Sequence, residues 1–216
     1  MNSTQAPPVL SIYTTFVFPR LMDWALRGGH FDEERSTLLR KVHGSILEIG
    51  FGTGLNLPHY PVTVSNLHAI DPVPLLPARV AARIAQAPFP VHLTYANAEV
   101  LPFATARFDW AVSTFTLCTV PDPIAELLEI KRVLKPGGRY LFLENGRRER
   151  PSVARWQDRL NPVQNVVGCG CNLNRAIDRL VMDAGLVIEQ LERRLLPGTP
   201  RLVGSLYCGA ARRVDR

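Results

Sequence analysis

A glycine-rich stretch at residues 46–56, ILEIGFGTGLN, is the first part of the sequence that could do chemistry. Gly50, Gly52 and Gly54 follow an apolar run in the pattern G-x-G-x-G, and such turns let a backbone approach a nucleotide closely. The dinucleotide fingerprint G-x-G-x-x-G has its third glycine one residue later. The carboxylate of Glu48 would repel a pyrophosphate but suit an ammonium or sulfonium charge. A nicotinamide cofactor and S-adenosylmethionine are the two candidates, and a tight turn without a ligand is the alternative.

Polar residues follow the next apolar runs of the chain at similar positions. Asp71, followed by Pro72, can accept hydrogen bonds from both hydroxyls of a ribose, which both candidate cofactors carry. Asn97, in the segment ANAEVLPF, could accept a hydrogen bond from an adenine amino group, or could be a turn residue. The segment STFTLCTVPDP, residues 113–123, offers no acidic or histidine side chain placed as a general base. These residues leave both cofactors open.

A sheet must bring the ends of several strands together for these side chains to meet. Five runs of strand length are nearly continuous in apolar residues, as strands buried on both faces are; they lie at 45–50, 66–71, 91–96, 108–114 and 139–145. Helical patterns between them predict a parallel sheet with helices on both faces. Two further runs, 186–196 and 201–211, have too short a connection for a crossover helix and should be antiparallel. We therefore predict an α/β fold with seven strands, mostly parallel.

The segments between the strands carry helix signals. Residues 74–87 repeat apolar side chains every fourth position, and residues 122–135 begin with Asp122 as N-cap and end at a Pro-Gly-Gly sequence. Residues 173–184 also show a helical repeat, followed by Gly185. The residues before the first strand predict two short helices broken at Gly28 and Gly29. We expect residues 1–43 to form a helical cap over the cofactor end of the sheet, with packing on an outer face as the alternative.

Five segments occur in the order and spacing of the class I S-adenosylmethionine-dependent methyltransferases: ILEIGFGTGLN, AIDP, ANAEVLPF, FDWAVSTFTLCTVPDP and EIKRVLKPGGRYLFLEN. Residues 44–145 therefore resemble that family. The resemblance implies a Rossmann-like three-layer fold with an antiparallel last strand, a methyltransferase domain over 44–216 and S-adenosyl-L-methionine as cofactor. By position, Glu48, Gly50 and Gly52 would face the methionine part, and Asp71 would hold the ribose. Asn97, Ala98 and Glu99 would border adenine, and Ser113 would lie beside the cofactor. The residues expected at the cofactor are Glu48, Gly50, Gly52, Gly54, Asn56, Asp71, Pro72, Asn97, Ala98, Glu99 and Ser113.

The second half of the chain resembles a narrower group, the membrane-associated methyltransferase-like proteins that methylate alkyl thiols and their bacterial relatives. The resemblance lies in WQDRLNPVQNVVGCGCNLNR, residues 156–175, and in TLCTV, residues 116–120. Asn145 stands where that group has a histidine. We expect a substrate cap near 146–173, and the candidate substrate residues are Cys118, Asn145, Trp156 and Cys171. Buried packing is the alternative role for Cys118, Cys171 and Trp156.

The expected function is methyl transfer to a small, fairly apolar acceptor, possibly a thiol, because no evident base follows the fourth strand. A quinone or a phospholipid headgroup is the alternative acceptor. An NAD-dependent oxidoreductase and an RNA methyltransferase are further alternatives. The position of the third glycine argues against the oxidoreductase, and the absence of an Asn/Asp-Pro-Pro-Tyr motif argues against the RNA methyltransferase.

Composition and charge limit the class of protein and its partners. The chain has 216 residues, 46% of them hydrophobic and 20% charged, as in ordinary globular domains. The net charge of +6 is diffuse apart from the cluster Arg147, Arg148 and Arg150 and the tail ARRVDR. We interpret the charge as a solvated basic face, so we expect no nucleic-acid partner. Without a signal peptide or an apolar run of about 18 residues, we expect a cytoplasmic protein, with peripheral membrane contact through the N-terminal segment left open. Cys169 and Cys171 lack further ligands nearby, so we expect no metal site.

Overall fold

The computed structural model describes residues 12–196, 199, 202 and 205–214. Seven strands form one sheet in the order β3-β2-β1-β4-β5-β7-β6. The strands are β1 (Gly44–Ile49), β2 (Val64–Asp71), β3 (Val91–Tyr95), β4 (Phe108–Thr114), β5 (Leu134–Asn145), β6 (Leu186–Leu195) and β7 (Ser205–Arg213). Neighbouring strands from β3 to β5 are parallel, while β7 is antiparallel to both β5 and β6. The predicted fold class is confirmed. The connection predicted at 197–200 falls largely outside the described residues.

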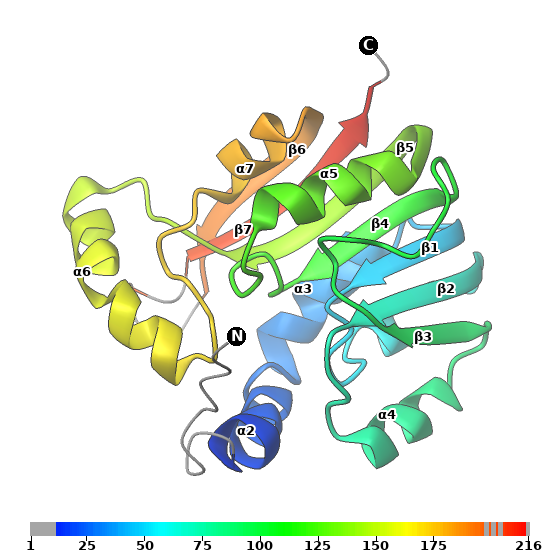
Figure 1. Cartoon of the computed structure of the whole chain (residues 1–216), viewed down its shortest axis with the longest axis horizontal. Coiled ribbons are helices and arrows are strands. Elements are labelled where there is room, and N and C mark those ends of the chain that lie inside the picture. The colour runs from blue at the N-terminus through cyan, green and yellow to red at the C-terminus, as the bar shows by residue number, and fades with distance from the viewer. Residues whose placement is uncertain (1–11, 197–198, 200–201, 203–204, 215–216) are drawn as a thin grey trace, which may run out of the picture.

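Helices cover both faces of the sheet, which forms the middle layer (Figure 1). They are α2 (Phe18–Ala25), α3 (Gly29–Leu39), α4 (Pro77–Ile84), α5 (Pro123–Val133), α6 (Pro151–Val167) and α7 (Ile177–Asp183), with a π-helical turn at Tyr13–Val17 and a 3-10 turn at Leu57–His59. Among the described residues, no helix is long and apolar enough to cross a membrane.

Two hydrophobic layers hold the helices to the sheet. Successive side chains of a strand point to opposite faces. In β1, Leu47 packs in the layer that contains residues of α5 and α7, while Ile46 packs in the layer that contains residues of α3 and α4. This burial on both faces explains why the parallel strands are nearly continuous in apolar residues.

Three predicted helices differ from the observed ones at their ends. The helix expected at 74–87 is shorter and begins at Pro77, because Leu76 has a left-handed backbone and Pro77 suits the first helical position. The helix expected at 122–135 has Asp122 as its N-cap, as predicted, but ends at Val133 because Leu134 pairs with Phe108 in the sheet. The fifth strand is therefore longer than predicted and includes the Pro-Gly-Gly sequence.

The third of these helices, expected at 173–184, begins at Ile177. Leu173 N instead donates a 2.8 Å hydrogen bond to Asn161 Oδ1 of α6, so this part of the chain is fastened to a distant helix. The two N-terminal helices break at Gly28 and Gly29 as predicted, and both glycines have positive φ. Figure 1 shows α2 and α6 near the edge of the sheet at which the parallel strands end.

Candidate active site

The glycine turn after β1 is held against the end of β2. The backbone N–H groups of Gly50 and Phe51 donate to Ile70 O, at 2.9 Å and 3.2 Å. Gly50 has a φ of +72°, and a Cβ at that position would lie 2.0 Å from Thr116 Oγ1. The first glycine is therefore required by packing against the segment after β4 as well as by its backbone conformation.

Asp71, at the end of β2, fixes the second glycine of the turn. Its Oδ2 accepts a 2.8 Å hydrogen bond from Gly52 N, and its Oδ1 accepts one of 3.1 Å from Val73 N. Burial raises the pKa of Asp71, although both backbone donors favour its ionised form. Pro72, the next residue, is exposed. The sheet thus brings Asp71 to the turn, although the two are far apart in sequence.

The space beside Gly52 could accommodate a nucleotide cofactor. A Cβ at Gly52 would have no neighbouring atom nearer than Gly50 O, at 4.0 Å, so that side of the turn is free of other parts of the chain. A side chain would fill this space, and glycine leaves it open. The open backbone and the adjacent Asp71 carboxylate are the combination expected for a ribose-bearing cofactor.

Glu48 and Asn56 lie on the α3 side of the sheet, in a buried hydrogen-bond network. Glu48 is 1% exposed, and its two carboxylate oxygens accept from Tyr60 OH at 2.8 Å and Asn56 Nδ2 at 3.0 Å. Asn56 Oδ1 in turn accepts a 3.1 Å bond from the buried Arg35 Nε of α3. Burial raises the pKa of Glu48 to about 7, against the opposing effect of the two donors. This network holds the segment after the glycine turn to the sheet and to α3.

Asp23 of α2 connects the N-terminal helices to the glycine turn. Thr53 Oγ1 donates to Asp23 Oδ1 at 2.5 Å, and Arg83 of α4 donates to the same oxygen at 2.7 Å. Arg27 and Arg79 also donate to this carboxylate. Burial opposes its ionisation, but hydrogen bonds from Arg83 and Thr53 and the charges of Arg83 and Arg27 outweigh burial and lower the pKa of Asp23 to about 2.

The segment after β3 forms a compact turn. Asn97 is exposed, and its Oδ1 accepts a 3.2 Å hydrogen bond from Glu99 N. Glu99 Oε1 accepts a 2.8 Å bond from Asp122 N, while Ala98 is buried. Asn97 thus has the turn geometry that the sequence left as an alternative, and its exposure leaves it free to contact a ligand as well.

Buried acids lie behind the ends of β4 and β5. Ser113 is fully buried, within 2.6 Å of Tyr140 OH, and donates a 2.9 Å hydrogen bond to Glu144 Oε1. Burial raises the pKa of Glu144 to about 7, even though Thr116 N also donates to it. Glu126 of α5 is fully buried, neither of its carboxyl oxygens has a hydrogen-bond partner among the described residues, and burial with the charge of Glu144 raises its pKa to about 8.

The candidate substrate residues fall into different environments. Cys118 is buried, and its Sγ donates a 3.7 Å hydrogen bond to Phe115 O. Interaction with the neighbouring Cys171 thiol raises the pKa of Cys118 and lowers that of Cys171. Asn172 Nδ2 also donates to Cys118 O at 3.0 Å, so the segments after β4 and α6 are joined. Trp156 is 53% exposed on α6 and is not a core residue. Asn145 Oδ1 is buried and has no hydrogen-bond partner among the described residues.

Comparisons with known proteins decide the family. A family model described as "Methyltransferase domain" matches residues 47–142. The thiol S-methyltransferase TMT1B of Rattus norvegicus is 32% identical over 172 residues, which cover 74% of this chain and 69% of that protein. The chain belongs to the class I S-adenosylmethionine-dependent methyltransferases. Its cofactor is S-adenosylmethionine, and its substrate is a methyl acceptor.

Two further similarities to this methyltransferase bear on function and fold. The phosphatidylethanolamine N-methyltransferase of Cereibacter sphaeroides is 30% identical over 167 residues, covering 76% of this chain and 77% of that protein. The solved structure of an S-adenosylmethionine-dependent methyltransferase from Aquifex aeolicus has a TM-score of 0.65 at 16% identity, covering 91% of this chain and 98% of that one. At that identity, the structural likeness supports the fold alone.

The predicted residues of the methyltransferase site separate into two groups in space. Gly52 and Asp71 meet at the open side of the turn, whereas Glu48, Asn56 and Ser113 are buried in networks behind it. The sequence did not reveal Asp23, Arg35 or Glu126. A buried carboxylate needs hydrogen-bond donors, so an acid within the apolar strand at Glu48 could have led us to expect a donor such as Tyr60 beside it. No local pattern in the sequence indicates that Asp23 packs against Thr53.

Proposed function

We propose that this methyltransferase transfers the methyl group of S-adenosylmethionine to the sulfur of a small, fairly apolar thiol. The observation that carries the proposal is the state of the acids behind β4 and β5. Glu144 and Glu126 are fully buried, and Glu144 already accepts hydrogen bonds from Ser113 and Thr116 N, so neither carboxylate is exposed to take a proton from an acceptor. A thiol with an ordinary pKa of about 8.5 is already a few per cent ionised at neutral pH and needs little help. The similarity to a thiol S-methyltransferase supports the same acceptor.

The open side of the glycine turn is the proposed cofactor site. When bound, S-adenosylmethionine supplies a methyl group that is already activated on a positively charged sulfur. The backbone of Gly50, Gly52 and Gly54 would lie against its methionine part, and Asp71 would accept hydrogen bonds from the ribose hydroxyls. Asn97, with Ala98, Glu99 and Pro72 around it, would border the adenine ring.

Three predicted cofactor residues are proposed to act through the turn. The side-chain oxygens of Glu48, Asn56 and Ser113 are already bonded to neighbouring residues in the buried networks. Their proposed role is to hold the turn and the end of β4 in place. Positioning of this kind is the main contribution that a protein makes when the methyl donor is already reactive, and well-oriented reactants gain roughly 7–11 kcal/mol from it.

A product assay tests the acceptor. The protein would be incubated with S-adenosylmethionine and benzyl thiol, with benzyl alcohol as the matched acceptor that differs in the reacting atom. We expect a methyl thioether and an equal amount of S-adenosylhomocysteine, detected by mass spectrometry, and no methyl ether. An Asp71→Asn variant should bind S-adenosylhomocysteine more weakly. Methylation of quinols or RNA without methylation of the thiol would refute the thiol proposal.

A phospholipid headgroup is the second candidate acceptor, favoured by the similarity to a phosphatidylethanolamine N-methyltransferase. Vesicles of phosphatidylethanolamine belong in the same assay, beside vesicles of phosphatidylcholine, whose nitrogen is already fully methylated. N-methylated lipid in the first sample and no product from the thiol would replace the proposed acceptor by the lipid amine.

A further inference from the structure

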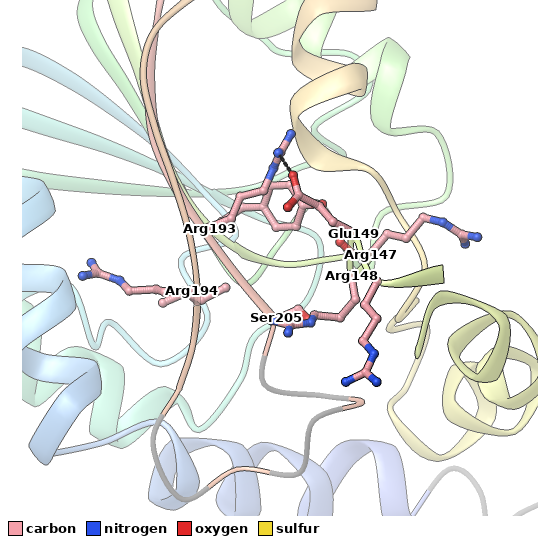
Figure 2. A pocket seen from close by; sticks show the side chains of 9 residues that line it. Arg147, Arg148, Glu149, Arg193, Arg194 and Ser205 are labelled. Carbon is pink, nitrogen blue, oxygen red and sulfur yellow. Dashed lines mark hydrogen bonds and ion pairs between the residues drawn. The ribbon is translucent and has the colours of Figure 1, made fainter. Parts of the chain in front are cut away.

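A pocket rich in arginine lies at the edge of the sheet formed by the ends of β5 and β6 and the start of β7 (Figure 2). Its volume is about 340 Å³, and its walls are residues 147–150, Arg193, Arg194 and residues 205–207. The parallel strand β5 ends at Asn145, so the pocket belongs to the same edge of the sheet as the glycine turn. Pockets for small ligands have volumes of about 300–1,000 Å³, so this one could hold a small polar group.

Three of the five arginines in the pocket already have carboxylate partners. Figure 2 shows Arg193 turned toward Glu149, while Arg194 points to the other side of its strand. Successive side chains of a strand point to opposite faces of the sheet, so Arg193 and Arg194 extend from opposite faces of β6. The pairs are Arg147 with Asp158, Arg193 with Asp178 and Glu149, and Arg194 with Glu34 and Glu192.

Arg148 and Arg150 form no ion pair with any residue that the structure describes. The Arg148 Nε–H group is buried and has no hydrogen-bond partner there. The buried Gln157 holds the adjacent backbone, because its Oε1 accepts a 2.8 Å bond from Arg148 N and its Nε2 donates to Gly146 O. The pocket therefore contains two guanidinium groups whose charge is not neutralised by a neighbouring carboxylate. The backbone of one of these residues, Arg148, is held in place by Gln157.

Ser205 contributes a hydroxyl group that also lacks a partner. It is 4% exposed, and its Oγ makes no hydrogen bond to the described part of the chain. Gly146 N donates a 2.9 Å bond to Ser205 O, so this residue is held against the end of β5. A buried donor without a partner is destabilising by about 1–3 kcal/mol, and a ligand that accepts from it would remove that penalty.

The N-terminus of α6 adds to the positive potential. Arg150 is the N-cap of this 17-residue helix, and no side chain caps the first backbone N–H groups. Pro151 has no N–H and Val153 N already donates to Arg150 O at 3.0 Å, so the favourable effect on an anion at this position comes from the positive end of the helix dipole. This contribution has the same sign as the two unpaired guanidinium groups.

We infer that this pocket binds the phosphate group of a ligand, a role that goes beyond the proposed methyl transfer and does not depend on it. A phosphate monoester has three terminal oxygens and a charge of about −1.5 to −2 at neutral pH, which matches two guanidinium groups and a hydroxyl donor. A carboxylate has two oxygens and a single charge, and so would satisfy fewer of these donors. Arginine also suits phosphate because its planar donors bind two oxygens at once.

Binding measured without the methyl donor tests this inference. Inorganic phosphate and glycerol 3-phosphate would be titrated into the full chain by calorimetry, with acetate as the carboxylate comparison. Vesicles of phosphatidylcholine with and without phosphatidic acid form a second arm. Saturable binding of the soluble probes would identify a free phosphate or phosphate ester, whereas binding of phosphatidic acid vesicles alone would identify a lipid headgroup. Binding should strengthen as the pH rises through about 6, where the phosphate acquires its second charge.

Variants connect the binding to the pocket. Ser205→Ala removes the hydroxyl and should weaken binding several-fold while leaving the fold intact, because that hydroxyl has no partner to lose among the described residues. Arg148→Gln should weaken binding at least about tenfold, since charge-assisted hydrogen bonds are the stronger kind. Arg40→Gln is the control for charge, because this exposed residue lies before β1, at the opposite edge of the sheet.

Circular dichroism would establish that each variant is folded. Equal affinity in the Ser205→Ala, Arg148→Gln and Arg40→Gln variants would overturn the inference, as would the absence of saturable binding for every phosphate probe. Because no methyl donor is present in these titrations, neither result would test the thiol proposal, which depends on the product assay alone.

Discussion

Replacing Gly52 by alanine would separate strain in the glycine turn from obstruction of the cofactor. Gly52 has a φ of +58°, and a Cβ there would meet no atom nearer than Gly50 O at 4.0 Å. A non-glycine residue in this left-handed region costs about 1–2 kcal/mol. For a chain of this size, that loss lowers Tm by roughly 2–8 °C. Since domains unfold with about 5–15 kcal/mol, the variant should remain folded.

The added methyl group would occupy the space that we assign to the cofactor. A displacement of about 1 Å in a bound reactant can lower a rate about 100-fold, so we expect kcat/KM to fall by about that factor. We also expect the affinity for S-adenosylhomocysteine to fall at least about tenfold, which corresponds to about 1.4 kcal/mol. Calorimetric titration measures the affinity, and thermal unfolding followed by circular dichroism measures the strain.

Gly137→Ala is the matched control for this experiment. Gly137 has a φ of +74° and would also place its Cβ in open space, but it lies near the start of β5, far along that strand from the site. It should show the same fall in Tm with an unchanged affinity for S-adenosylhomocysteine. If Gly52→Ala binds S-adenosylhomocysteine as tightly as Gly137→Ala does, the assignment of the open side of the turn to the cofactor is wrong.

Two further predictions concern buried charges. The carboxyl of Glu126 is protonated up to about pH 8 in the folded chain but ionises near its ordinary pKa of 4.5 when unfolded, so stability should fall as the pH rises through that interval. Glu126→Gln should reduce this fall by roughly 1–3 kcal/mol in urea unfolding, whereas Glu129→Gln, which removes a carboxyl with a lowered pKa, should not. Asp23→Asn should lower the free energy of unfolding at neutral pH by roughly 3 kcal/mol and weaken S-adenosylhomocysteine binding, because it removes the buried charge that pairs with Arg79 and Arg83. Arg27→Gln, at a half-exposed side chain, should cost less than about 1 kcal/mol, and equal effects of these two changes would contradict the role given to Asp23.

The strand pattern was predictable because burial on both faces leaves a continuous apolar run in the sequence. The strand at 108–114 has the expected bounds, and Asp122 caps the next helix as its residue type indicates. The end of that helix was wrong by two residues, because Leu134 pairs with Phe108, a contact that local propensity does not encode. Similarly, residues 173–176 were not helical because their segment is bound to α6.

The sequence by itself determined the type of turn and the positions of the strands along the chain, and its resemblance to a family determined the class of cofactor. The turn and the strands follow from local requirements: glycine for positive φ and apolar runs for a buried sheet. The tertiary structure decided which polar groups face the open turn and which are buried behind it. Glu48 belongs to the second group because Tyr60 and Asn56 occupy its carboxylate oxygens.

The tertiary structure also decided what the basic residues near 147–150 do. In the sequence they form a basic cluster, which we interpreted as a solvated surface. Folding pairs Arg147 with Asp158, leaves Arg148 without an ion pair among the described residues, and brings Ser205 to the same pocket. The reason is physical: whether a charge is neutralised or available to a ligand depends on neighbours in space, and those neighbours come from strands and helices that are distant in the chain.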